Sequence, residues 1–141
     1  MREILFRAKR IDNGEWVEGY YLKTTLGKDI EPSDVIFVPF KINRSGQWGW
    51  IKVLPETLCQ FTGMVDKNGR RIWENDIIKH EISDTIGVVK WYQEDYVGWC
   101  VDDIVIGEQQ FTDEMWNECE VIGNVFGNPE LMKGDQSCTD L

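Results

Sequence analysis

The side chains best suited to chemistry lie between residues 74 and 80, where two carboxylates and the single histidine of the chain come close together in sequence. Glu74 and Asp76 are two residues apart, and on a β-strand that spacing puts both carboxylates on one face. There they could hold a divalent cation or share a proton, as a metal-dependent enzyme would require. More often such a pair forms a solvated rim of a sheet. No residue is therefore assigned as a metal ligand.

His80 follows Lys79 near the end of a predicted strand and could act as a general base or a pH-sensitive group. A lone histidine without an accompanying nucleophile in the sequence is more often a surface or hydrogen-bonded structural group. The chain contains no GxSxG, P-loop, dinucleotide-binding or HExxH motif. The sequence thus predicts a non-enzymatic protein with no catalytic residue and no cofactor.

The cysteines and the N-terminus indicate a cytoplasmic protein. Cys59, Cys100, Cys119 and Cys138 lack the CxxC spacing of zinc and redox sites. The apolar run before Arg7 is too short for a signal peptide or a membrane span, so no membrane partner is expected. In a reducing compartment the cysteines should be free and mostly buried thiols.

The net charge of −10 is unevenly distributed along the chain. Residues 1–90 contain 14 Lys and Arg against 13 Asp and Glu, whereas residues 91–141 contain one Lys against twelve acidic residues. Such a field repels phosphate backbones and attracts basic surfaces, so the predicted partner is a protein rather than a nucleic acid. The alternative is a solvated face that maintains solubility. The candidate acidic interaction surface comprises Asp102, Asp103, Asp113, Glu114 and Glu118, with Asp95, Glu108, Glu120 and Glu130 nearby in sequence.

One basic cluster keeps nucleic-acid binding by a small barrel as the lesser alternative. Lys67, Arg70, Arg71 and Lys79 lie near Trp73 and could combine phosphate contacts with base stacking. A solvated hairpin over a buried tryptophan would show the same pattern, because tryptophan in a small domain mostly packs in the core.

The pattern of β-prone runs and turn residues predicts a mainly β fold, a β-rich α+β class with small barrel-like or rolled antiparallel sheets. Two hairpins are expected first, the earlier one around Asp12-Asn13-Gly14, and Pro39 should lie at an edge or a bulge. One or two very short helices should follow Thr112 and Asn128, which are suitable N-caps. The predicted strands cover residues 4–10, 15–23, 35–38, 48–54, 72–73, 76–82, 86–92, 97–101 and 121–126, with an irregular connection at 55–63 and helices at 112–116 and 128–132.

Domain organisation follows from the same pattern. We expect a single domain over residues 1–133, with a possible N-terminal part at 1–54, a barrel-like part at 64–127 and a flexible tail at 134–141. Unpaired strand edges also make a homo-oligomer possible.

Asp66-Lys67-Asn68-Gly69 begins like a calcium loop, but its glycine comes two places too early for an EF-hand. A type I′ or related turn explains the pair better, because both Asn68 and Gly69 tolerate positive φ. We therefore predict a tight reversal at Asn68 and Gly69, with Gly69 at positive φ.

Three segments of the chain carry a recognisable pattern. They are the string from Leu54 to Gly63 with its continuation to Trp91, the closing run from Glu120 to Leu131, and Phe6-Arg7-Ala8 with Trp16 and Gly19 near the start. This pattern resembles that of the YopX family of phage and prophage proteins, and the resemblance covers about residues 4–132. It implies a β-rich fold and a phage or prophage origin. It supplies no catalytic residues.

Overall fold

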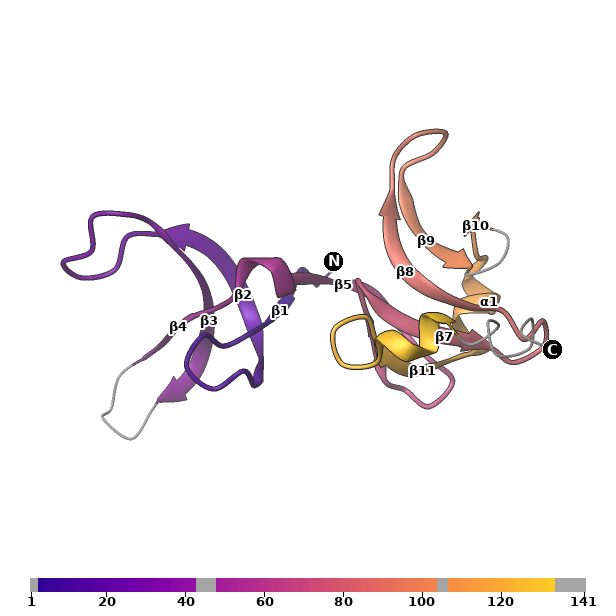
Figure 1. The fold of residues 1–141 in the computed structure, drawn as a ribbon, viewed down its shortest axis with the longest axis horizontal. Coiled ribbons are helices and arrows are strands. Elements are labelled where there is room, and N and C mark those ends of the chain that lie inside the picture. The colour runs from indigo at the N-terminus through magenta and orange to yellow at the C-terminus, as the bar shows by residue number, and fades with distance from the viewer. Residues whose placement is uncertain (1–2, 43–47, 104–106, 134–141) are drawn as a thin grey trace. The chain divides into compact units, whose positions relative to one another are not determined.

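The computed structural model describes residues 3–42, 48–103 and 107–133, and it confirms a mainly β fold (Figure 1). The chain divides into two compact units, with the boundary between Phe61 and Thr62. The strands are β1 (Phe6–Lys9), β2 (Trp16–Thr24), β3 (Ser33–Ile42), β4 (Trp48–Lys52), β5 (Cys59–Val65), β6 (Arg71–Trp73), β7 (Asp76–His80), β8 (Ile86–Tyr92), β9 (Gly98–Asp103), β10 (Gly107–Gln109) and β11 (Cys119–Asn124).

The strands form two antiparallel sheets with the orders β4-β3-β2-β1-β5-β6 and β10-β9-β8-β7-β11. Within the described residues the first and last strands of each sheet do not pair with each other, so neither sheet closes into a barrel. The rolled-sheet form of the prediction is confirmed. The helical elements are short, as expected: η1 (Pro55–Thr57), α1 (Asp113–Asn117) and η2 (Pro129–Lys133).

The first unit begins with the predicted hairpin, in which Phe6 pairs with Gly19 and Lys9 pairs with Trp16. Gly14 has φ of 71° in the connecting turn, a conformation that glycine adopts without steric cost. Side chains alternate across the strands, so one face of the sheet is buried. That core contains Ala8, Ile36 and Val53, with Phe6, Val17, Tyr21, Val38, Ile51 and Leu58 packed against it.

The second hairpin of this unit, β3–β4, is also confirmed, and its register shifts between Val38 and Ile42. Pro39 lies within that shift, where its missing N–H removes no regular ladder bond. The irregular connection predicted at 55–63 is wrong beyond residue 58. From Cys59 the segment forms a strand, β5, and its Cys59 and Gln60 pair with β1. This explains why Thr62 and Gly63 do not fit a helical pattern.

The second unit combines the curved five-stranded sheet (Figure 1) with β6, part of β5 and α1, which contribute to one core. Val89 on β8, Val101 on β9 and Trp116 on α1 are all buried in this core. The helix begins as predicted: the hydroxyl of Thr112 accepts a hydrogen bond from the backbone N–H of Met115. The remaining buried members are Ile72, Ile78, Phe111, Cys119 and Val121.

The other predicted strands of this unit are present, and β8 has the predicted bounds. Sequence patterns missed β10, because Gly107–Gln109 carries no β-branched or aromatic residue. Among the described residues, no helix has the length and apolar character that crossing a membrane requires.

Candidate functional site

Glu74 and Asp76 do not share a strand face, so that part of the prediction is wrong. The chain reverses between β6 and β7, with Asn75 at φ of 70°, and Glu74 lies in this turn. Asp76 is only 2% exposed, and its carboxylate accepts the backbone N–H of Trp73 at 2.8 Å. Within the described ranges, no three His, Cys, Asp or Glu side chains are grouped as a metal site requires. Asp76 therefore fixes the turn between β6 and β7.

His80 is a buried, hydrogen-bonded group that links three segments of the second unit. Its Nε2 lies 2.8 Å from Glu118 Oε2, at the end of α1, and its Nδ1 lies 2.6 Å from Ser83 Oγ, in the turn after β7. The backbone N–H of Ser83 also donates to Nδ1 at 3.3 Å. This places the proton on Nε2, where it is donated to the Glu118 carboxylate.

Serine, histidine and a carboxylate in this order resemble a catalytic triad, and Ser83 was not predicted as a partner of His80. Ser83 meets His80 from within the same turn, however, and its Oγ also bonds Thr85 Oγ1 at 2.8 Å. The imidazole ring packs 5.5 Å from the ring of Phe111. The arrangement closes the turn and docks the end of α1, which is the structural role expected for a lone histidine.

The turn at Asn68-Gly69 is present, and Gly69 has φ of 77°. In the described chain, Asn75 and Asp84 are the non-glycine residues with positive φ, so Asn68 keeps a negative value and the turn is not type I′. Instead Gly69 N–H bonds the Asp66 carbonyl and Asp66 N–H bonds the Arg70 carbonyl, which describes a type I turn followed by a left-handed glycine.

Asp66 is the residue that the sequence missed in this turn. Its side chain is 3% exposed, and Oδ1 accepts the backbone N–H groups of Asn68 and Arg70 at 2.9 and 2.8 Å. Its Oδ2 accepts the N–H of Val121 on β11 at 3.0 Å. The carboxylate therefore holds the turn against a strand 55 residues later in the chain. An Asp at the first position of an Asx turn was the available signal.

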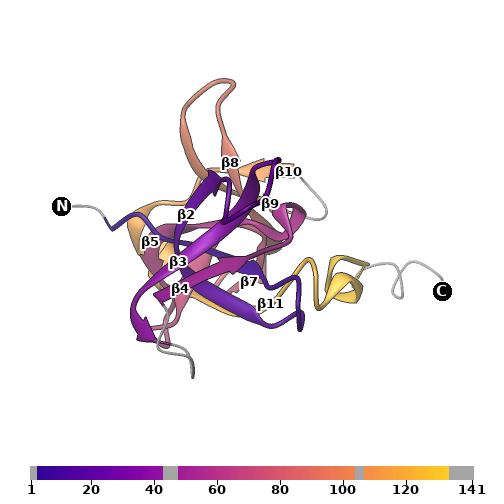
Figure 2. The same ribbon diagram turned by 90° about the vertical axis from the view of Figure 1, so that its left-hand side faces the viewer.

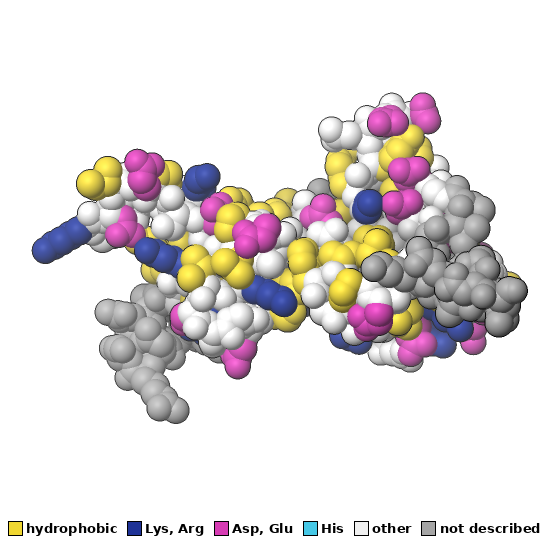
Figure 3. Space-filling model, in the orientation of Figure 1, with side chains coloured by type: hydrophobic (Ala, Val, Ile, Leu, Met, Phe, Trp, Pro, Cys, Tyr) yellow, Lys and Arg dark blue, Asp and Glu magenta, His cyan; other side chains and the backbone are white. Residues whose placement is uncertain are grey.

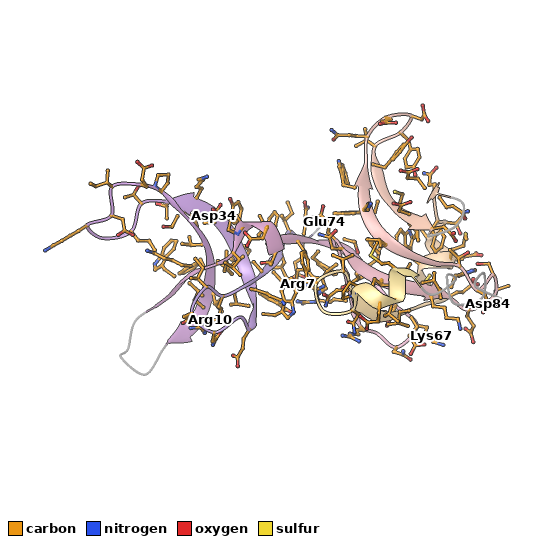
Figure 4. The ribbon with its side chains drawn as sticks, viewed as in Figure 1. Arg7, Arg10, Asp34, Lys67, Glu74 and Asp84 are labelled. Carbon is orange, nitrogen blue, oxygen red and sulfur yellow. The ribbon has the colours of Figure 1, made fainter. Side chains whose placement is uncertain are left out.

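The basic cluster around Trp73 does not form a stacking platform. Trp73 is 3% exposed, so its ring cannot receive a base. Lys67 lies 3.9 Å from Glu120, and Lys79 lies 3.8 Å from Asp84. Together with Glu81 these four residues line a polar cavity of about 150 Å³. Figure 4 labels two of the lining residues, Lys67 and Asp84. Carboxylates thus offset the charge of Lys67 and Lys79, two of the four cations of the predicted cluster.

Cys59, Cys100 and Cys119 are buried thiols that form no disulfide among the described residues, as predicted, whereas Cys138 lies outside the described residues. Burial raises the pKa of Cys119 to about 12, and the nearby carboxylates of Glu118 and Asp66 add to the shift. Burial also raises the pKa of Cys100. Both thiols therefore stay protonated at neutral pH and are poor nucleophiles.

The predicted acidic residues differ in how far their charge is available. Asp113 and Glu114 are exposed in the first turn of α1. Asp102 on β9 pairs with Lys90 at 3.0 Å, and the Glu118 carboxylate is taken up by His80. Asp103 is half-buried on β9. The helix therefore supplies the most accessible part of the predicted surface.

The β8–β9 hairpin adds acidic and aromatic groups that the predicted surface did not include. Figure 3 shows carboxylates and hydrophobic side chains together on this hairpin. Glu94 and Asp95 are exposed at its tip, and Asp95 accepts a hydrogen bond from the Tyr92 hydroxyl at 3.2 Å. Trp91 is 42% exposed and Val97 is 72% exposed. Trp91 and Val97 are residue types that are typical of strands, so their exposure was not predictable from the sequence.

The first unit carries a different exposed feature, an aromatic row across β2, β3 and β4. Tyr20 pairs with Phe37, and Phe37 pairs with Trp50, so the three rings follow one another on one face. The rings of Phe37 and Trp50 are 4.6 Å apart, and Tyr20 and Trp50 are about half exposed. The neighbouring residues Tyr21 and Ile36 point to the core on the other face.

Comparison with known proteins identifies the class. The family model described as YopX protein matches residues 5–133, nearly the whole chain. The chain therefore belongs to the YopX family, as its sequence motifs indicated. A similar solved structure is that of protein EF1440 from Enterococcus faecalis, with 19% identity, a TM-score of 0.49, and coverage of 94% of this chain and 99% of that chain. No curated protein matches.

Proposed function

We propose that this protein is a phage or prophage accessory protein that acts in the host cytoplasm by binding a basic protein. Membership of the YopX family supports the origin. The observation that carries the mode of action is the charge division between the two units. The first unit contains nine Lys and Arg against eight Asp and Glu, whereas the second contains six against seventeen. The second unit alone thus accounts for the charge imbalance of the chain.

Part of this negative charge is exposed to solvent on α1 and on the β8–β9 hairpin. Asp113 and Glu114 lie in the first turn of α1, and Glu94 and Asp95 lie at the hairpin tip. Three cations of this unit, Lys67, Lys79 and Lys90, are each paired with a carboxylate. Such a field speeds association with a basic surface and weakens as salt screens it.

A basic protein surface that normally binds nucleic acid fits this field best. Carboxylates on a rigid helix and hairpin can occupy the place of phosphates, so binding would compete with DNA for the partner. The same carboxylates repel free duplex DNA. Mimicry of nucleic acid is therefore the specific form of the proposal.

The test compares two ligands under the same conditions. The intact protein is immobilised and exposed to duplex DNA and to bacterial lysate, each at low and at physiological salt, and retained proteins are identified by mass spectrometry. Basic, nucleic-acid-handling proteins should be retained more strongly at low salt, and DNA should not bind. Tight binding of DNA would overturn the proposal.

Charge variants make the test specific to the second unit. Asp113→Asn with Glu114→Gln should weaken retention of the basic proteins. Glu31→Gln with Glu56→Gln removes the same number of exposed charges from the first unit and should leave retention unchanged. Equal losses from the two pairs would show that net charge, rather than this surface, attracts the partner.

The aromatic row of the first unit favours a second candidate function, binding of single-stranded nucleic acid. Tyr20, Phe37 and Trp50 occupy adjacent strands, which is how sheet-based modules stack successive bases. The unit carrying them is nearly neutral, so repulsion is much weaker there than in the second unit. The aromatic row, rather than the cluster around Trp73, is therefore the candidate surface for nucleic acid.

Oligothymidylate titration distinguishes this second function. Stacking on Trp50 should quench tryptophan fluorescence, and Trp50→Ala should abolish the quenching while Trp91→Ala leaves it intact. No quenching at low salt would eliminate the alternative. Quenching that persists in Trp50→Ala would place the nucleic acid elsewhere.

A further inference from the structure

The outer half of the β8–β9 hairpin extends beyond the strands that support its base. β7 pairs with β8 at residues 86–88, and β10 pairs with β9 at residues 101–103. In the described part of the chain, Lys90–Tyr92 is paired only with Gly98–Cys100. Figure 1 and Figure 2 both show this loop end reaching away from the rest of its unit. A two-stranded ribbon of this kind is marginally stable unless its side chains hold it.

Aromatic pairs on both faces hold the ribbon in one conformation. Trp91 and Trp99 pair across the strands with ring centroids 5.0 Å apart in an edge-to-face arrangement. On the other face, the rings of Tyr92 and Tyr96 are 4.6 Å apart. The indole N–H of Trp91 donates to Gln93 Oε1 at 3.1 Å, so this polar group is already satisfied. The arm is therefore preorganised and loses little entropy on binding.

The apolar surface of the arm continues the core outwards. Trp99 packs against the core cluster, Trp91 follows it along the same face, and both Trp91 and Val97 remain exposed. Tryptophan in a preformed position is the residue most enriched among interface anchors. A partner that covered Trp91 and Val97 would bury apolar area that nothing in the described chain covers.

The charges around these anchors select the partner. Residues 86–103 contain Lys90 against Glu94, Asp95, Asp102 and Asp103, and Lys90 is paired with Asp102. A second copy of this chain would bring the same negative charge, and an anionic lipid or nucleic-acid surface would be repelled. A protein pocket with apolar walls and a rim of Lys or Arg complements both features.

We propose that the β8–β9 hairpin is a recognition arm that inserts Trp91 and Val97 into an apolar pocket rimmed by Lys or Arg on the partner protein. The assignment rests on the proposed function, because it names the part of the acidic unit that makes the specific contact. The carboxylates at the tip orient the arm on the basic rim, and the two apolar side chains provide the contact that persists at physiological salt.

A library of random displayed peptides provides a defined probe. Selection on the intact protein at physiological salt should enrich peptides with a bulky apolar residue flanked by Lys or Arg. For a purified selected peptide, Trp91→Ala and Val97→Ser should each raise Kd about tenfold or more, the loss typical of an anchor. Ile30→Ser removes a more exposed apolar side chain from the first unit and should leave Kd within about twofold.

The outcomes separate this inference from the function on which it rests. Basic peptides that weaken with Asp113→Asn and Glu114→Gln, but bind Val97→Ser normally, would overturn the arm and leave the acidic surface standing. Selection of peptides without basic residues would overturn both. Val97→Ser matters because it leaves all four rings of the aromatic pairs in place, so its effect on binding can be separated from the folding of the ribbon.

Discussion

The two units use the same turn residues in different ways. Asp12-Asn13-Gly14 in the first unit is an exposed turn, in which the Asp12 carboxylate pairs with Arg10 at 2.7 Å, and that contact lowers the pKa of Asp12. Asp66 in the second unit is buried and joins its turn to β11. Each turn ends in a glycine at positive φ. Turn chemistry thus sets the reversal in both units, and burial of the aspartate decides whether the turn also fixes tertiary structure.

The largest expected effect is that of removing the buried aspartate. Asp66→Ala leaves three backbone N–H groups without their acceptor, including that of Val121. The variant should lose on the order of 3 kcal/mol of unfolding free energy, measured by urea denaturation. Asp12→Ala is the matched control and should leave the unfolding midpoint unchanged. Equal losses of unfolding free energy in the two variants would show that burial of the aspartate does not decide its structural role.

Replacing either turn glycine by alanine should cost the two units the same stability. A Cβ at Gly14 or Gly69 meets no atom within 4 Å, so the cost of alanine comes from the positive φ alone. Gly14→Ala and Gly69→Ala should each cost about 1 kcal/mol. Gly98→Ala is the control, because Gly98 is outside the positive-φ set and its Cβ would meet only Tyr96 at 4.0 Å. Thermal unfolding that ranks Gly98→Ala with the others would contradict this account.

The last effect is absent at neutral pH, appears only in alkali and belongs to the acidic unit. Burial beside Glu118 and Asp66 raises the pKa of Cys119 from 9.0 to about 12. Between those values the unfolded thiol has lost its proton while the folded one keeps it, so unfolding free energy should fall as pH rises from about 9 to about 12. Cys119→Ala should flatten this dependence. Chemical denaturation across that range measures it, and an equally steep fall in the variant would refute the assignment.

Much of the fold was predictable because its local signals agree with one another. The opening hairpin follows from Asp12-Asn13-Gly14, and α1 follows from Thr112 with two acidic residues after it. The strand β5 was missed because Thr62 and Gly63 are weak local signals, and its pairing with β1 is a long-range contact. β10 was missed for the same reason, since neighbouring β9 rather than composition makes Gly107–Gln109 a strand.

The candidate site was predictable in its charge and not in its shape. The excess of carboxylates after residue 90 locates the acidic unit, and the structure adds that Asp102 and Glu118 have partners while Asp113 and Glu114 are exposed. No sequence pattern shows that β8 and β9 extend beyond the strands β7 and β10 that pair with them. The length of the unsupported hairpin depends on how far the neighbouring strands reach. The exposure of Trp91 follows from that pairing alone.

The turn at Asp66 has a consequence for the behaviour of the protein at high concentration. β11 is a terminal strand of its sheet, and such strands template fibril growth when their outer backbone groups are open. Here the Cys119 carbonyl accepts the Lys67 N–H at 2.9 Å, and the Val121 N–H is bound by Asp66. The turn thus occupies the positions where an incoming chain would add. Protection against aggregation at this strand is therefore supplied by a turn more than 50 residues earlier in the chain, through the Asp66 carboxylate and the Lys67 N–H.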